Sequence, residues 1–227
     1  MKFRNKKILN YILIILLILN IPLILYSLNF NNFVFNENFY KKEFQKHGVY
    51  DKLKNYDIEK VNKGVLDYLK YKNVKLAGND FFNEREKTHL KDVKDLIHFI
   101  SFIFYFSVFL FLILFILLII LNGNYKTIIK NIGIVFLFGG ALTLLDAFIF
   151  WLLIKFNFQF TFELMHKIFF KAGTYVFDPS FENIIILYPQ QFFYDITVNI
   201  VVNTLVFSLF LFLIGLFVVV YKQRLHN

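Results

Sequence analysis

The sequence predicts an α-helical integral membrane protein, with four transmembrane helices and a small α+β extracytoplasmic cap. Two observations predict this fold class. Of the 227 residues, 58% are hydrophobic by type, whereas soluble domains contain about 45–50% apolar residues. Four stretches are also long enough to cross a bilayer, which requires about 20 consecutive apolar residues. A soluble enzyme, a nucleic-acid-binding protein and a disulfide-stabilised scaffold are therefore excluded.

The first apolar stretch, residues 8–28, is interpreted as a retained membrane anchor. Four cations precede it, namely Lys2, Arg4, Lys6 and Lys7, as they would precede a secretory signal. However, no small-residue cleavage site follows, and the apolar core is longer than the roughly 7–15 residues of a signal peptide. We therefore expect the N-terminus to remain in the cytoplasm.

The three further spans are predicted at residues 99–121, 132–154 and 196–220. The predicted regions are 1–28 (N-terminus and first span), 29–98 (cap), 99–154 (second and third spans), 155–195 (aromatic-rich outer segment) and 196–227 (fourth span and tail). The N-terminus, the turn between the middle spans and the tail carry Lys and Arg without any acid. By the positive-inside rule, short loops rich in Lys and Arg stay in the cytoplasm. The cap has 14 Lys/Arg and 11 Asp/Glu, but long loops count little in this rule. Both termini are thus expected in the cytoplasm.

The two outer segments have different patterns. In the cap, residues 40–47 and 57–71 have helical periodicity, and Gly48 is suited to end the first helix. Residues 30–39 and 72–82 look more extended, which predicts a few strands. The second segment is rich in Phe and Tyr, and alternating phenylalanines at 156–162 predict a strand or a membrane-entering stretch. Its rings suit an aromatic belt at headgroup depth, an aromatic-walled lipid pocket, or both.

His89 is the first candidate for acid–base chemistry because of the charged residues near it. Arg85, His89 and Asp92 fall at i, i+4 and i+7, and Glu86 lies three residues before His89. A nearby carboxylate orients an imidazole and raises its basicity, as a general base requires. The alternative is structural: Asn83 followed by Glu86 resembles a capping box at a helix start.

His166 is the second candidate, soon after the third span and again at the outer side. A lone histidine among aromatic residues is most often simply packed, but two at similar depth on different segments favour a shared site. The chain has no Cys, so a thiolate nucleophile and a CxxC metal site are excluded. Motifs of serine hydrolases, zinc metalloproteases and phosphate-binding loops are also missing from the sequence.

Asp146 lies inside the third span, where an ionisable side chain is a functional candidate by default. The favoured interpretation is an interhelical contact, because Thr143 is one turn away and Asn199 and Asn203 share one face of the fourth span. The glycine pair at 139–140 permits close helix approach.

The motifs together resemble the lipoprotein intramolecular transacylase family over the whole chain. The residues that carry the resemblance are Phe82-x2-Arg85-Glu86-x2-His89-x2-Asp92-Val93, His166-x2-Phe169-Phe170, Phe177-Asp178-Pro179 and Tyr188-Pro189-x2-Phe192-Phe193-x-Asp195. One departure is Tyr175, where a Trp is expected in the aromatic run of the family.

The resemblance implies an intramolecular acyl transfer in the bacterial cytoplasmic membrane, without a cofactor. The sn-2 acyl chain of an S-diacylglyceryl cysteine moves to the α-amine of that cysteine, which gives a lyso-form lipoprotein. The two histidines of the family map onto His89 and His166. We expect His89, supported by Asp92 or Glu86, to act as base and His166 to protonate the leaving oxygen, or the reverse. The expected supporting or substrate-binding residues are Arg85, Glu86, Asp92, Phe169, Phe170, Tyr175, Asp178 and Phe192.

The implied partners are a diacylated bacterial lipoprotein and membrane lipid, with no nucleic acid. Two alternatives stay open at this point. A membrane metalloenzyme would use His89 and His166 with Glu86 or Asp92 as ligands, since two His and a carboxylate are an accepted zinc set. A non-enzymatic membrane sensor or assembly factor would instead use the cap to bind a partner. A transporter is the least favoured class.

Overall fold

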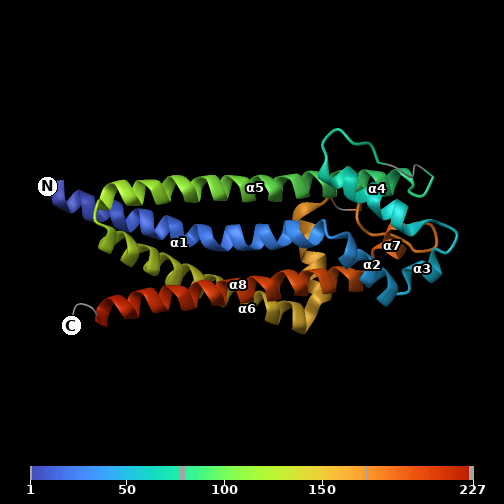
Figure 1. Ribbon diagram of the computed structural model, residues 1–227. Coiled ribbons are helices and arrows are strands. Elements are labelled where there is room, and N and C mark those ends of the chain that lie inside the picture. The colour runs from blue at the N-terminus through green and yellow to red at the C-terminus, as the bar shows by residue number, and fades with distance from the viewer. Residues whose placement is uncertain (1, 77–79, 172, 225–227) are drawn as a thin grey trace. The chain divides into compact units, whose positions relative to one another are not determined.

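A computed structural model describes residues 2–76, 80–171 and 173–224 of the protein. These residues form eight helices, which Figure 1 labels along the chain. The helices are α1 (Lys2–Val34), α2 (Glu37–Lys46), α3 (Val49–Lys52), α4 (Ile58–Lys70), α5 (Glu84–Asn122), α6 (Tyr125–Phe169), α7 (Ile184–Leu187) and α8 (Gln190–Arg224).

The four long helices α1, α5, α6 and α8 confirm the prediction of four spans, since each is long and apolar enough to cross a membrane. Only 17% of the most apolar window of α5 is buried inside the protein. Its apolar side chains therefore face outward, which for a soluble helix would be unfavourable and for a lipid-solvated helix is expected. Each long helix extends beyond its predicted apolar stretch, so the spans continue into the cap as helix.

The chain divides into two compact units. The first, here called the bundle unit, contains residues Met1–Asn29, Phe102–Trp151 and Ile200–Asn227. Leu13, Leu17 and Ile21 of α1 are buried in one cluster with Leu118 of α5 and Val135 of α6. Burial of such side chains away from solvent stabilises the unit, although in lipid the contribution comes from close packing rather than from water exclusion.

Small residues set the closest helix approach in the bundle unit. A Cβ atom on Gly140 would lie 2.6 Å from the backbone nitrogen of Phe212, so α6 and α8 touch through their backbones there. Asp146 accepts a 3.5 Å hydrogen bond from the hydroxyl of Tyr26 on α1, and Asn29 donates to Thr204 of α8 at 3.1 Å. Polar contacts of this kind join helices in apolar surroundings.

The second unit, here called the cap unit, contains residues Phe30–Ser101 and Leu152–Asn199. The two helices predicted in its first part are present as α2 and α4. Side chains of Asn36 and Asp57 cap these helices by accepting from the backbone N–H groups of Phe39 and Lys60. Gly48 follows the end of α2 with a φ of 65°, a conformation that glycine adopts without strain.

The prediction of strands in the cap was wrong, because residues 2–76, 80–171 and 173–224 contain none. Residues 30–34 continue α1 as helix, and α2 begins after only two residues. The segment 71–76 has no regular structure beyond a turn at 72–73, and 77–79 lie outside the described residues. Phe30 and Phe33 fit one helical face, whereas Phe33, Phe35 and Phe39 fit one face of a strand, so this short apolar pattern could not decide between helix and strand.

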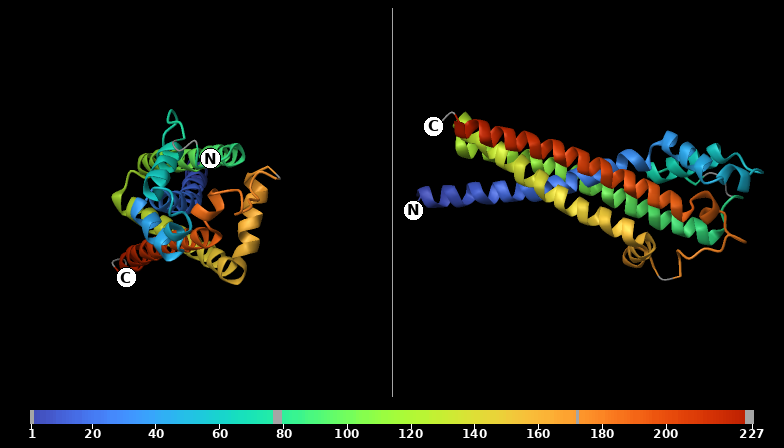
Figure 2. Two further views of the ribbon diagram at one scale, coloured as in Figure 1. Left: turned by 90° about the vertical axis from the view of Figure 1, so that its right-hand side faces the viewer. Right: turned by 90° about the horizontal axis from the view of Figure 1, so that it is seen from below.

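The alternating phenylalanines at 156–162 are also helical, as part of α6. Asn157 interrupts this helix with φ −156° and ψ 76°. Its side-chain oxygen accepts from the backbone N–H of Phe160 at 3.0 Å, as an N-cap residue does. The helix therefore starts afresh at this residue, and the part of α6 that follows it is coloured from gold to orange in Figures 1 and 2.

Candidate active site

The cap unit brings His89 of α5 and His166 of α6 together. Their ring centroids are 6.2 Å apart and the ring planes are nearly parallel, with an angle of 15°. His89 is 7% exposed and His166 is 8% exposed. Two imidazoles that are 77 residues apart in the sequence thus share one enclosed position.

Aromatic rings surround this histidine pair. Phe170 contacts both imidazoles, at 4.9 Å from His89 and 5.3 Å from His166 between ring centroids. Phe177 lies 5.3 Å from His89. Phe162 and Tyr175 lie 4.2 Å and 5.1 Å from His166. The immediate surroundings of the pair are therefore mainly apolar.

Burial in this wall favours the neutral form of both imidazoles. The charged residues of α5 end before its apolar stretch begins at Phe99, so His89 lies outside the membrane-spanning part of that helix. Burial, and to a smaller extent the neighbouring His166, lower the pKa of His89 to about 4. Burial also lowers the pKa of His166, and its hydrogen bond to the backbone of Phe162 partly opposes this effect.

The two rings differ in their hydrogen bonds. Nδ1 of His166 lies 2.8 Å from the carbonyl oxygen of Phe162. Because a carbonyl only accepts, Nδ1 carries the proton, and in the neutral ring Nε2 holds the lone pair. Nδ1 of His89 is buried and has no hydrogen-bond partner within the described part of the chain. A buried polar atom of this kind is costly unless a ligand satisfies it.

Glu86 is engaged by backbone groups. One carboxylate oxygen accepts from the N–H of Asn83 at 2.6 Å, and the other accepts from the N–H of Ile184 at 2.7 Å. The side chain of Asn83 accepts in turn from the N–H of Glu86. This is the capping box that the sequence offered as the structural alternative. Asp92, further along α5, is partly buried.

Arg85 holds the loop 173–182, here called the covering loop. Its guanidinium donates to a carboxylate oxygen of Glu182 at 3.1 Å and to the backbone carbonyls of Gly173 and Val176. It also lies 5.1 Å from the ring of Phe177. Arg85 was expected to support the site or to bind substrate, and these contacts favour a supporting role, because the guanidinium binds the covering loop.

Comparison with known proteins identifies the family. The model of the family described as lipoprotein intramolecular transacylase Lit matches residues 7–193. The chain belongs to this family. The matched region contains both imidazoles, Arg85 and the covering loop.

Solved structures of a Lit protein have the same fold. The membrane-integral lipoprotein intramolecular transacylase Lit from Bacillus cereus matches with a TM-score of 0.80 and 22% identity, over 95% of this chain and 98% of that one. A variant of the same Bacillus cereus protein, in which a histidine is replaced by arginine, matches with a TM-score of 0.78 and 21% identity, over 100% and 98% of the chains. At such identity the likeness shows the fold. No curated protein matches the sequence.

Three other expected site residues lie elsewhere in this Lit-family chain. Asp178 shapes the covering loop, where its side chain accepts from the N–H of Ser180. Phe169 is 52% exposed. Phe192 is buried in a separate aromatic cluster of the cap, 4.9 Å from the ring of Tyr40. Phe170 and Tyr175 thus contact the imidazoles, whereas Phe192 contacts the rings of the separate cluster.

A second group of titratable side chains joins α2 to α8. Ligand atoms of Glu43, His47 and Asp195 lie within 4.8 Å of one another, and among the described residues no other trio of possible metal ligands does so. His89 and His166 are not members, so the metal-ligand set considered for them is not assembled. Lys46 lies 2.7 Å from Asp195 and 3.4 Å from Glu43, so its one positive charge offsets part of the charge of the two carboxylates.

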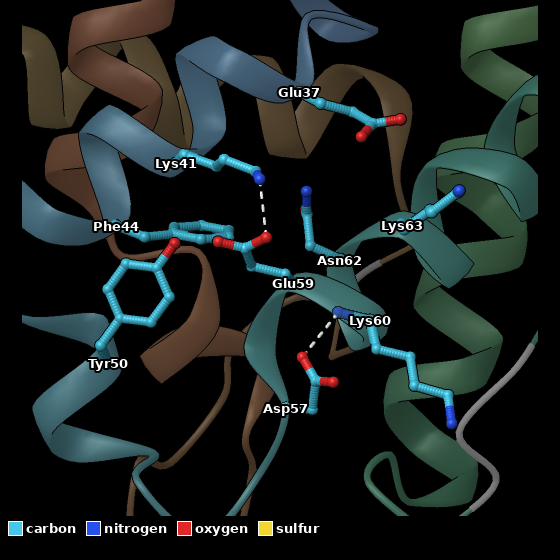
Figure 3. A pocket seen from close by; sticks show the side chains of 9 residues that line it. All are labelled: Glu37, Lys41, Phe44, Tyr50, Asp57, Glu59, Lys60, Asn62 and Lys63. Carbon is cyan, nitrogen blue, oxygen red and sulfur yellow. Dashed lines mark hydrogen bonds and ion pairs between the residues drawn. The ribbon is translucent and has the colours of Figure 1, made fainter.

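The cap unit also contains a cavity of about 460 Å³ between α2, α3 and α4. Figure 3 shows Lys41 bound to Glu59, with an N···O distance of 2.6 Å. Asn62, which lines the same cavity, accepts at 2.9 Å from the hydroxyl of Tyr188. The lining of this cavity contains three lysines and three carboxylates, and it includes neither His89 nor His166.

Glu182 was missed by the sequence analysis, although it is only 4% exposed. Its second carboxylate oxygen accepts from the backbone N–H of Asp178 at 2.7 Å. The one signal in the sequence is the Asp178-Pro179 turn followed by an acid at the fourth position, because such an acid can satisfy the N–H groups of a turn. The sequence indicated Phe162 only as one of the alternating phenylalanines at 156–162.

Proposed function

We propose that this chain is an intramolecular transacylase of bacterial lipoproteins. It moves the sn-2 acyl chain of an S-diacylglyceryl cysteine from the glyceryl oxygen to the α-amine of the same cysteine, and so produces a lyso-form lipoprotein. Membership of the Lit family supports the reaction class. The observation that carries the proposal at the level of residues is the pair of buried imidazoles 6.2 Å apart inside an aromatic wall.

His166 is proposed as the base. The amine must lose a proton as it attacks the ester carbonyl, and Nε2 of His166 holds the lone pair because Nδ1–H donates to Phe162. The same carbonyl stabilises the imidazolium that forms when Nε2 accepts the proton. This assignment reverses the order first expected from the sequence, and the support for it is the fixed tautomer.

His89 is proposed to face the leaving glyceryl oxygen. A protein group at this place must give a proton as the C–O bond breaks. Nδ1 of His89 is buried without a partner, so a substrate oxygen would satisfy it. A neutral imidazole with one N–H group can donate a hydrogen bond to that oxygen, and the proton that His166 accepts from the amine then passes to the glyceryl oxygen, so both imidazoles end neutral as they began.

The aromatic wall is proposed to fold the substrate headgroup and to exclude water. Donor and acceptor belong to one molecule, so no acyl-enzyme is needed. Correct orientation of two such groups can lower the barrier by about 7 kcal/mol or more. The rings of Phe170, Phe177 and Tyr175 are the parts of the wall that contact the imidazoles.

The proposal also covers the orientation of the chain in the membrane and whether the reaction needs a metal ion. The termini lie in the cytoplasm, the histidine pair lies on the outer side of the membrane, and the reaction needs no metal. The excess of Lys and Arg in the N-terminus and in the turn before α6 supports the orientation.

The test is co-expression with a model diacylated lipoprotein and tandem mass spectrometry of its N-terminal peptide. The native chain should give a product with the acyl group on the α-nitrogen. His89→Gln and His166→Gln should each reduce this product by about a hundredfold or more, because general acid–base catalysis contributes that much. A chelator should leave the yield unchanged.

Lys91→Ala and Lys167→Ala are the matched controls, since both lysines are exposed and neighbour the histidines in sequence. They should retain the native yield. An S-diacylated peptide with a free amine, recovered from cells that contain folded native chain, would contradict the proposed function. Full activity in both histidine variants would refute their assignment while leaving the reaction class intact.

A further inference from the structure

The covering loop is fixed to α5 by one ion pair. Arg85 uses its guanidinium on the carboxylate of Glu182 and on the carbonyls of Gly173 and Val176. Glu182 is buried, and its other oxygen accepts from the N–H of Asp178. The two side chains therefore bind the loop at its beginning, middle and end.

Alternate residues of the covering loop face opposite directions. The ring of Tyr175 contacts His166 and the ring of Phe177 contacts His89, whereas Val176 between them is 66% exposed. Phe177 also lies against the guanidinium of Arg85, which precedes His89 by one turn of α5. The ring of Phe177 thus contacts both the cation and the imidazole, and it meets the imidazole edge-on at 67° between the ring planes.

This arrangement matters because water competes with the amine. In the transfer, a C–N bond forms, the bond from the carbonyl carbon to the glyceryl oxygen breaks, and the proton of the amine ends on that oxygen. In hydrolysis, water attacks the same carbonyl carbon, one proton of water goes to the glyceryl oxygen, and a free fatty acid leaves. A neutral imidazole that accepts a proton from an amine can equally accept one from water.

We propose that the Arg85–Glu182 pair holds the covering loop over both imidazoles and thereby decides between acyl transfer and ester hydrolysis. The inference rests on the proposed function and assigns a positioning role to two residues that do not touch the reacting atoms. Loss of the pair frees Phe177 and Tyr175 from the histidines and admits water. The enzyme then acts as a lipoprotein esterase.

The experiment uses the purified full chain in lipid vesicles with a synthetic diacylated lipopeptide. Both products are quantified by mass spectrometry, and heavy-oxygen water identifies acid released by hydrolysis. Glu182→Gln and Arg85→Lys should each raise the ratio of free fatty acid to N-acyl peptide by about tenfold, the effect expected for loss of a charge-assisted hydrogen bond. Phe177→Ala should reproduce this change, and adding Glu182→Gln to it should raise the ratio no further.

Glu84→Gln is the matched control, because Glu84 pairs with Lys87 on the same helix at 2.8 Å and is 90% exposed. It should leave the product ratio at the native value. Partial unfolding lowers both products together, so the ratio separates positioning from stability. An unchanged ratio in Glu182→Gln and in Phe177→Ala, with native chain active, would overturn the inference. Failure of the native chain to form N-acyl peptide would instead overturn the proposed function.

Discussion

Burial keeps His89 neutral over the pH range in which an exposed histidine titrates. The aromatic wall lowers the pKa of His89 to about 4, whereas the unfolded chain titrates it near 6.5. The spacing of Arg85, His89 and Asp92 identified this residue from the sequence. It did not identify Glu182, because a buried acid in an irregular loop belongs to no helical or strand period.

The depressed pKa of His89 predicts a pH-dependent stability. Below about pH 6.5 the unfolded chain binds a proton that the folded chain does not bind until about pH 4, so the free energy of unfolding falls as the pH falls through this window. Above about pH 6.5 the contribution of His89 to the free energy of unfolding is constant. Thermal unfolding in detergent at several pH values measures the slope, and His89→Gln should make it shallower.

Lys91→Gln provides the control for this slope, because Lys91 lies on the same helix, two residues after His89, and is exposed. Other carboxylates also protonate at low pH, so only the difference between native chain and variant is informative. Equal slopes for the native chain and His89→Gln would show that the imidazole is not held neutral in the folded state.

At the scale of elements, the start of α5 illustrates how a structural explanation replaced a functional one. Glu86 lies beside His89 in helical spacing, which made it a candidate partner of the imidazole. Its two oxygens instead satisfy the N–H groups of Asn83 and Ile184. Helix starts leave several such donors unpaired, and a nearby carboxylate binds them before it binds a neutral imidazole one turn away.

Glu86 is accordingly predicted to stabilise α5 and α7 rather than to catalyse. Glu86→Ala leaves the buried N–H of Ile184 and the part-buried N–H of Asn83 without their partner, which should lower the free energy of unfolding by about 2–4 kcal/mol. Thermal or denaturant unfolding in detergent measures this loss. Glu84→Ala, two residues earlier and exposed, should change it by less than about 0.5 kcal/mol.

For Glu86→Ala, the folded fraction should still transfer acyl groups at a rate per folded molecule close to that of the native chain. A variant of native stability would refute the capping role. A fully folded variant without activity would return Glu86 to the list of candidate supports for His89.

For the whole molecule, the sequence predicted the features that amino-acid composition determines. It missed features for which short segments fit more than one secondary structure. The four spans were evident because about 20 apolar residues in a row have one physical explanation. The prediction of strands in the cap was wrong because segments of a few residues satisfy helical and extended patterns equally. The meeting of His89 and His166 was expected from their similar depth on segments that lead into different spans and from the family resemblance, since no local pattern relates residues of different helices.

The absence of Cys makes the orientation directly testable. Lys54→Cys places a thiol on the exposed surface of the cap, and Lys126→Cys places one near the turn that precedes α6. A membrane-impermeant maleimide added to intact cells should label the first variant and leave the second unlabelled, because both termini are proposed to be cytoplasmic. Permeabilised cells should label both, and the opposite pattern would invert the proposed topology.

The interruption of α6 at Asn157 has a consequence for how this enzyme can change through evolution. Since the helix begins again at a residue that caps its own new first turn, the rotation of His166 is set only nine residues upstream. Insertions or deletions in the lipid-embedded half of α6 would shift that half without turning the imidazole away from its partner. The length of the hydrophobic segment can therefore change to suit bilayers of different thickness while the proposed catalytic pair keeps its geometry.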